Sequence, residues 1–246
     1  MNSIFHSRSA SGLAGVLPVR NLHRVLLFLT MLNLALRGDG TITLPSQDVI
    51  ASIDKAQENR EHQLTGYAAR EHYTVRNSHF NHSAELEAKV VFRKGKGKTY
   101  TILSRSGPGV LQERVIGRIL KEDAKLSSSV ERPHNLLTSA NYSIELKGIQ
   151  SLHGTSCYVV KILPRVHNFA LIEGDAWFDG QSFSLLRIEG KPAASPSFWT
   201  GKPLIEREYI IVEGLSFPQH SRATSKGFIT GKSELTIDYS EYELLK

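Results

Sequence analysis

The sequence predicts a mainly β protein of the α+β class, in which amphipathic helices cover the concave face of an antiparallel sheet. Two observations predict it. About ten segments alternate apolar and polar residues with a period of two, which is typical of half-buried antiparallel strands. Two further segments carry an apolar stripe at helical spacing. Because ten twisted strands rarely form a flat sheet, we expect the sheet to curl and to offer its concave face to the helices.

The first predicted helix covers residues 46–62. Ser46 is expected to cap its N-terminus, with an acidic residue in the first turn. The helix has one apolar face, which must lie on an apolar surface. The residues of that face are Val49, Ile50, Ile53 and Ala56.

Three predicted strands follow at residues 67–76, 85–93 and 98–104. The second alternates most cleanly, and its inward residues are Leu86, Ala88, Val90 and Phe92. In the first, Tyr67, Tyr73 and Val75 share one side, and Arg70 and Arg76 lie opposite. The basic run 93–98 contains two glycines, so we interpret it as a solvated hairpin turn; the alternative is a contact with phosphate or an anionic headgroup.

A second amphipathic helix is predicted at residues 110–126, after the strand is broken at 107–109. Its apolar stripe consists of Val110, Leu111, Val115, Ile119 and Leu120. The remaining strands are predicted at 141–149, 155–164, 168–179, 183–190, 204–213, 217–225 and 232–243, and turn-forming residues connect them. The single cysteine, Cys157, lies in an apolar run and is expected to be a small core residue.

Residues 1–40 predict an export signal. They contain one acidic residue, Asp39, and a run of 12 largely apolar residues, Val25–Leu36. A membrane-spanning helix needs about 20 residues, so a basic start and a short apolar run indicate a secretory signal peptide. Residues 41–246 are then expected to form a single domain. The alternatives are a buried helix and an uncleaved segment that anchors the protein in the inner membrane.

Composition and motifs argue against nucleic-acid binding and catalysis. The chain has 30 basic and 24 acidic residues, but part of the excess lies in residues 1–40, so the net charge of +6 is weak evidence for a nucleic-acid partner. Neither a G-x-S-x-G elbow nor a P-loop is present. His79 and His82 lie in a polar loop, which argues against a metal site. We therefore expect no enzyme activity, no cofactor and no metal.

Three carboxylates could in principle act as acid and base. Glu173, Asp175 and Asp179 lie at even spacing on one predicted strand and so share a face with Trp177. The simpler interpretation is a charged outer face that carries one aromatic residue.

The C-terminal half resembles a known family. The resemblance is carried by an ordered series of segments: 141–148, 157–165, 173–179, 187–192, 195–199, 217–218 and 231–239. This series resembles the LolA/LolB-like superfamily of outer-membrane lipoprotein-sorting proteins, and especially a divergent branch of periplasmic members. The likeness spans most of residues 46–245. It implies a strongly curved, unclosed half-barrel whose hydrophobic concave side, covered by helices, holds acyl chains.

The resemblance implies a periplasmic binding or carrier protein for a lipid or lipoprotein acyl chain, acting in outer-membrane lipoprotein sorting or envelope biogenesis. The protein is expected to be monomeric and soluble after signal cleavage. Its partners are then a lipid or acylated lipoprotein, with inner- and outer-membrane proteins that load and unload it, and no nucleic acid. The alternative is a non-transporting periplasmic sensor or envelope-assembly module that uses the same curved sheet.

Ligand contacts are predicted from the inward positions of the strands and of the second helix. They are Val90, Phe92, Tyr100, Ile102, Val115, Ile119, Tyr142, Ile144 and Leu186. Plain core packing is the alternative for each of them. Phe198 and Trp199, in a proline-rich connection, are a further candidate aromatic contact, or else a plug over the sheet edge.

Overall fold

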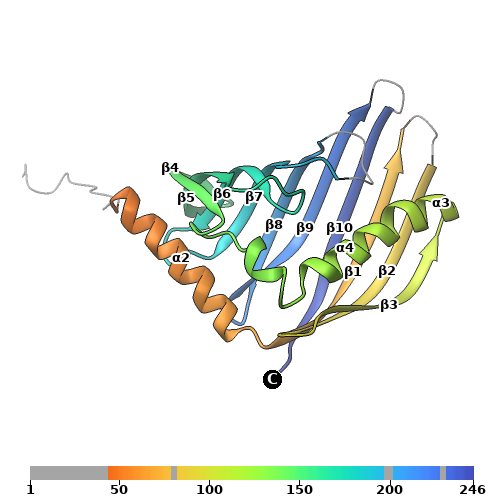
Figure 1. Cartoon of the computed structure of the whole chain (residues 1–246), viewed down its shortest axis with the longest axis horizontal. Helices are drawn as coiled ribbons and strands as arrows, with labels where there is room; N and C mark the ends of the chain where they lie inside the picture. Colours follow the sequence, from red (N-terminus) through yellow and green to blue (C-terminus); the bar gives the residue numbers. More distant parts are fainter. Residues whose placement is uncertain (1–43, 79–81, 197–201, 228–230) are drawn as a thin grey trace, which may run out of the picture. The chain divides into compact units, whose positions relative to one another are not determined.

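Ten antiparallel strands form one curved, unclosed sheet with helices over its concave face, as the computed structural model of the chain shows (Figure 1). This confirms the predicted fold class. The structure describes residues 44–78, 82–196, 202–227 and 231–246, which belong to one compact unit, Leu44–Lys246. The strands are β1 (Gly66–Asn77), β2 (His82–Arg93), β3 (Gly97–Ser106), β4 (Tyr142–Leu152), β5 (Thr155–Pro164), β6 (Ile172–Asp179), β7 (Leu185–Pro192), β8 (Leu204–Val212), β9 (Leu215–Gly227) and β10 (Gly231–Leu244).

The strand order explains why part of the chain crosses the sheet. The order is β3-β2-β1-β10-β9-β8-β7-β6-β5-β4, so β3 and β4 are the two edges although they follow each other in sequence. The crossing segment (residues 107–141) must therefore pass from one edge to the other. It carries α3 (Gly109–Leu111), the π-helix η2 (Gln112–Ile116), α4 (Gly117–Leu126) and the 3₁₀-helix η3 (Arg132–Asn135). In Figure 1, α4 lies across the concave side of the sheet.

Bulges in five strand pairs account for the curvature. Within the described residues, the register shifts in the pairs β1–β10, β2–β3, β4–β5, β6–β7 and β8–β9. A bulge places two residues opposite one, bends its strand and increases the local twist. Repeated along the sheet, these bends make one face concave.

Two elements cover the concave face, helix α2 (Ser46–Gln63) and the crossing segment, and we call them the covers. They pack on different halves of the sheet. Helix α2 buries Val49 and Ile53 completely, in a cluster with residues of β4–β7 such as Phe178. Ile116 and its apolar neighbours in the crossing segment pack instead on β1 and β2, around Tyr73. Between these clusters, an aromatic group of Tyr67, Phe92, Phe217 and Tyr242 joins the two halves of the sheet.

A buried glutamine positions the start of the crossing segment. The side-chain amide of Gln112 donates hydrogen bonds to the carbonyl oxygens of Glu85, at 2.7 Å, and Ser106. Gln112 begins the π-helical turn, a wider winding than the predicted α-helix. Sequence periodicity predicts helix here but does not distinguish the two windings.

One local prediction is wrong, and a second, the solvated turn in 93–98, is right except at its end. Pro45, not Ser46, occupies the N-cap of α2, and no side chain caps this helix. Since Ser46 already lies inside the first turn, its hydroxyl is no longer at the capping position. The run 93–98 does form a glycine-containing turn, but Lys98 is only 13 % exposed and is ion-paired. It is the second residue of β3 and lines the concave side, so it is not a solvated turn residue. The predicted signal segment, residues 1–40, lies outside the described residues.

Candidate ligand-binding cavity

A cavity lies between the covers and the concave face of the sheet. This central cavity has a volume of about 390 Å³ and is walled by α2, the crossing segment and most of the inner strands. A side cavity of about 160 Å³ adjoins it and shares Ile119, Phe169, Ile205, Arg207 and Ile237 with it. Pockets for small molecules typically measure about 300–1,000 Å³, so the central cavity is large enough for a ligand.

Apolar and aromatic side chains form most of the lining. The sheet contributes Ile172, Leu185, Ile188, Ile205, Phe217 and Ile237, and the crossing segment contributes Ile119, Leu126, Leu136 and Leu137. Pro192, Pro196 and Pro203 line the side cavity. The lining residues of the sheet face inward because alternate residues of a strand share a face. Such a lining favours the aliphatic part of a ligand.

One wall of the central cavity is polar and is built around Lys98. The Lys98 ammonium lies 2.6 Å from a carboxylate oxygen of Asp123 in α4 and 3.4 Å from one of Glu71 in β1. The Tyr100 hydroxyl donates to Asp123, and the Tyr73 hydroxyl donates to Glu71. Lys98 thereby ties α4 to the sheet through its own strand.

The pKa values of the two carboxyl groups around Lys98 are shifted in opposite directions. Burial raises the pKa of Glu71, which is 2 % exposed, and the Lys98 ammonium offsets this only in part. Burial also acts to raise the pKa of Asp123. There the Lys98 ammonium and the hydrogen bonds from Lys98 and Tyr100 outweigh it and hold the pKa below its usual value. Asp123 is therefore the carboxylate that neutralises Lys98.

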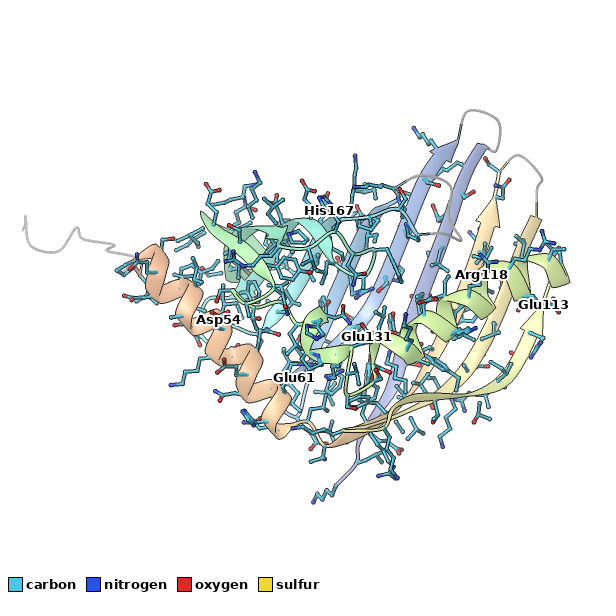
Figure 2. All side chains as sticks on the ribbon, viewed as in Figure 1. Asp54, Glu61, Glu113, Arg118, Glu131 and His167 are labelled. Carbon is cyan, nitrogen blue, oxygen red and sulfur yellow. The ribbon has the colours of Figure 1, made fainter. Side chains whose placement is uncertain are left out.

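Ion pairs and hydrogen bonds join helix α2 to the crossing segment. The Arg132 guanidinium donates to both carboxylate oxygens of Glu61, at 2.7 and 2.6 Å, and lies 4.5 Å from the centre of the Phe92 ring. Asp54 accepts hydrogen bonds from the Ser139 backbone N–H, at 2.8 Å, and from its hydroxyl, at 2.5 Å. Figure 2 shows Asp54 and Glu61 on the side of α2 that faces the crossing segment. The two covers are thus fastened to each other as well as to the sheet.

Arg207 lies where the two cavities meet. It belongs to β8 and lines both cavities. Its Nε donates to the Ser221 hydroxyl at 3.0 Å, and the Tyr209 hydroxyl is a second partner. Ser221 in turn donates to the Tyr239 hydroxyl at 3.5 Å. The immediate partners of this guanidinium are therefore neutral hydroxyl groups.

The structure places two of the nine predicted ligand contacts, Ile119 and Tyr142, in the lining of the central cavity. Val90 and Phe92 are fully buried in the core. Tyr100, Ile102 and Val115 pack against the cluster around Tyr73, and Ile144 packs against the α2 cluster. Leu186 is half-buried at the β6–β7 bulge. Contact of any of the nine with a ligand stays a prediction, and Phe198 and Trp199 lie outside the described residues.

Sequence reasoning missed the charged residues of the cavity wall, although the alternation contains the signal. Glu71, a buried partner of the wall residue Lys98, lies between Tyr67 and Tyr73 on the inward face of β1, and Arg207 lies between Ile205 and Tyr209 on that of β8. A charged residue at an inward position of a predicted strand is therefore the sequence signal that indicates a polar part of the concave face. Its ion-pair partner on a distant element cannot be identified in the same way.

The outer face carries the carboxylates of β6. Asp175 pairs with Lys147 at 2.7 Å, and Arg187 lies 5.4 Å from the centre of the Trp177 ring. Within the described ranges, no group of three or more His, Cys, Asp or Glu side chains is placed to hold a metal ion. His79 lies outside these ranges, as does the side chain of His82. None of the described helices has both the length and the apolarity that crossing a bilayer requires.

No protein-family model and no curated protein matches the chain. Among solved structures, the chain is similar to LolA-like proteins. A LolA superfamily protein from Nitrosomonas europaea is 11 % identical, with a TM-score of 0.46 over 83 % of this chain and 95 % of that one. A domain described as an outer-membrane lipoprotein-sorting protein from Vibrio parahaemolyticus is 13 % identical (TM-score 0.45; 79 % and 91 % covered). A DUF1329 family protein from Desulfovibrio piger is 11 % identical (TM-score 0.43; 82 % and 94 % covered). Identities this low leave the function to be inferred from the cavity.

Proposed function

We propose that the protein is an exported, non-enzymatic binding or carrier protein for the acyl chain of a lipid or lipoprotein. The observation that carries the proposal is the central cavity: the side chains of the concave face and of the covers leave about 390 Å³ between them, with a largely apolar lining. Each CH₂ group that leaves water for such a lining contributes about 0.8 kcal/mol. An aliphatic chain therefore suits the cavity better than a polar metabolite does.

The covers give such a ligand a route in and out. The crossing segment is held by side-chain contacts such as Lys98–Asp123 and Glu61–Arg132 rather than by strand pairing. Elements held in this way open at lower cost than the strands of a sheet. We therefore assign the crossing segment the role of a movable lid.

The finer assignment is supported by the sequence. The basic N-terminal segment with its short apolar run supports export to the periplasm, with residues 41–246 as the mature domain. The ordered C-terminal series supports a role in outer-membrane lipoprotein sorting or envelope biogenesis. Membrane proteins that load and unload the ligand are part of that proposal.

Filling the cavity tests this function. Ile205 on β8 lines both cavities, whereas Ile210 on the same strand is 39 % exposed. We expect Ile205→Trp to abolish uptake of the neutral apolar dye N-phenylnaphthylamine, which fluoresces in apolar surroundings, because the indole occupies the space that the dye needs. The matched variant Ile210→Trp is expected to bind like the wild type. Equal dye binding by all three folded proteins would contradict the proposal.

A second candidate is a non-transporting module that binds protein. The observation in its favour is that β3 and β4 are both edge strands, and an edge can accept a strand from another chain. Under this alternative the cavity is incidental, so Ile205→Trp would retain partner binding. If Ile205→Trp fails to replace the wild type in cells, the carrier proposal is supported. If it replaces the wild type fully, the protein-binding module is supported.

A further inference from the structure

Among the described residues, five basic side chains line the two cavities, and four of them have a carboxylate partner. Glu61 pairs with both Arg60 and Arg132. Lys98 pairs with Asp123 and Glu71, and Arg222 pairs with Glu234. Arg207 is the fifth.

No carboxylate of the described residues lies within ion-pair distance of Arg207. Its partners are the hydroxyls of Ser221 and Tyr209. Asp123 also lines the central cavity, but the ammonium of Lys98 and the hydroxyl of Tyr100 already bind it. Of the segments outside the described residues, 79–81, 197–201 and 228–230 contain neither aspartate nor glutamate, and residues 1–43 contain one acid, Asp39, in the predicted signal segment.

A guanidinium in this position is poorly satisfied by hydroxyl groups alone. It stays charged at any physiological pH and has five N–H donors, one of which binds the Ser221 hydroxyl. A cation in an apolar wall is costly unless an anion pairs with it. The planar guanidinium also matches the two oxygens of a carboxylate or phosphate, which an ammonium does not.

We infer that the cavity binds an amphiphile with one anionic head, a carboxylate or a phosphate monoester, which pairs with Arg207 while the aliphatic chain lies along Ile119, Phe169, Ile205 and Ile237. This inference rests on the proposed function and specifies the ligand class. A neutral lipid would leave Arg207 without a direct ion-pair partner, because Asp123 acts on it only from beyond ion-pair distance, and a cationic amphiphile would be repelled.

The test compares probes that share one chain and differ in the head. Palmitate, hexadecyl phosphate, hexadecanol and inorganic phosphate are titrated at neutral pH against N-phenylnaphthylamine bound to the wild type, to Arg207→Gln and to Arg70→Gln. Arg70 is an exposed arginine on the outer face, paired with Glu87 and Glu241. Circular dichroism and thermal midpoints establish that each variant is folded.

We expect the wild type and Arg70→Gln to bind palmitate or hexadecyl phosphate at least about tenfold more tightly than hexadecanol, since a charge-assisted hydrogen bond is worth that much. Arg207→Gln is expected to lose this preference and to bind hexadecanol unchanged. The two anionic probes distinguish the head groups, and inorganic phosphate alone should displace no dye.

Three results would overturn the inference. One is equal affinity of the wild type for palmitate, hexadecyl phosphate and hexadecanol; this leaves the acyl-chain function standing. Another is a preference for the anionic probes that survives in Arg207→Gln. The third is displacement by inorganic phosphate, which would indicate a site for free phosphate. If the wild type binds neither dye nor hexadecanol, the proposed function fails together with the inference.

Discussion

The Lys98 ammonium lies 2.6 Å from a carboxylate oxygen of Asp123 and so joins strand β3 to helix α4. The same ammonium is 3.4 Å from Glu71 on β1. One cation therefore faces two carboxylates. Because their pKa values are shifted in opposite directions, the two acids are expected to affect stability with opposite signs.

Replacing Asp123 should loosen the crossing segment. Breaking a buried ion pair costs about 3–5 kcal/mol. The side chain of Asp123 is 38 % exposed and Glu71 still faces Lys98, so we expect Asp123→Asn to lower the free energy of unfolding by about 1–3 kcal/mol. Urea denaturation measures this. Glu113→Gln, at an exposed acid of the same segment, is the control and should change the free energy of unfolding by less than about 0.5 kcal/mol.

The difference in the free energy of unfolding between the wild type and Asp123→Asn should depend on pH, and this dependence tests whether the pKa of Asp123 is lowered in the folded protein. A carboxylate whose folded pKa lies below its unfolded pKa stabilises the protein fully above the unfolded value, about 3.9 for aspartate, and loses this effect as the pH falls through the folded value. The difference in the free energy of unfolding between the wild type and Asp123→Asn should thus be constant around neutrality and disappear only below about pH 4. A difference that disappears between neutral pH and pH 5 would contradict the assignment.

Replacing Glu71 should have the opposite effect. Its folded pKa is raised, chiefly by burial, so the ionised carboxylate costs stability at neutral pH. A glutamine side chain at this position keeps the shape and can still accept from the Tyr73 hydroxyl without the charge. We expect Glu71→Gln to be more stable than the wild type at neutral pH, with the gain vanishing below about pH 4.3, the unfolded pKa of glutamate. Destabilisation at neutral pH would show that Lys98 needs both carboxylates.

Arg132 should control how often the cover opens. Lysine at this position loses both the two-oxygen contact with Glu61 and the stacking over Phe92, because an ammonium has neither the fork nor the flat face. We expect Arg132→Lys to speed amide hydrogen exchange in residues 127–139 while leaving the central strands unchanged. Arg118→Lys, at an exposed position of α4 (Figure 2), is the control. Unchanged exchange in Arg132→Lys would mean that the Glu61 contact does not hold the cover.

Two glycines face each other across β6 and β7 and allow the two strands to approach closely. Gly174 pairs with Gly190, and a Cβ on Gly174 would lie 2.0 Å from the carbonyl oxygen of Glu189. Backbone must then move, so we expect Gly174→Ala to cost on the order of 3 kcal/mol in a thermal or urea denaturation. Gly109→Ala, where a Cβ meets nothing within 4 Å, should be nearly neutral. Similar stabilities of the two variants would contradict this packing.

Local patterns predict most of the fold. Strict alternation in residues 85–93 marks β2, and the stripes around Val49 and Ile119 mark the two helices, since both signals follow from backbone geometry alone. The pairing of β1 with β10 and the π-helical turn at Gln112 depend on contacts distant in sequence, so no local pattern reveals them.

The candidate site is less visible in the sequence than the fold is. An inward residue can fill the core, as Val90 does, or line the cavity, as Ile119 does. Which of these happens depends on how far the covers stand from the sheet. That distance is set by tertiary contacts such as Lys98–Asp123, which join residues of different elements.

Native mass spectrometry of the protein purified from its own cell envelope tests the central claim most directly. We predict a bound species with the mass of an acylated amphiphile, which is released when the protein unfolds and is absent from Ile205→Trp prepared in the same way. A wild-type protein that is free of any such adduct, and that also fails to take up N-phenylnaphthylamine, would contradict the account.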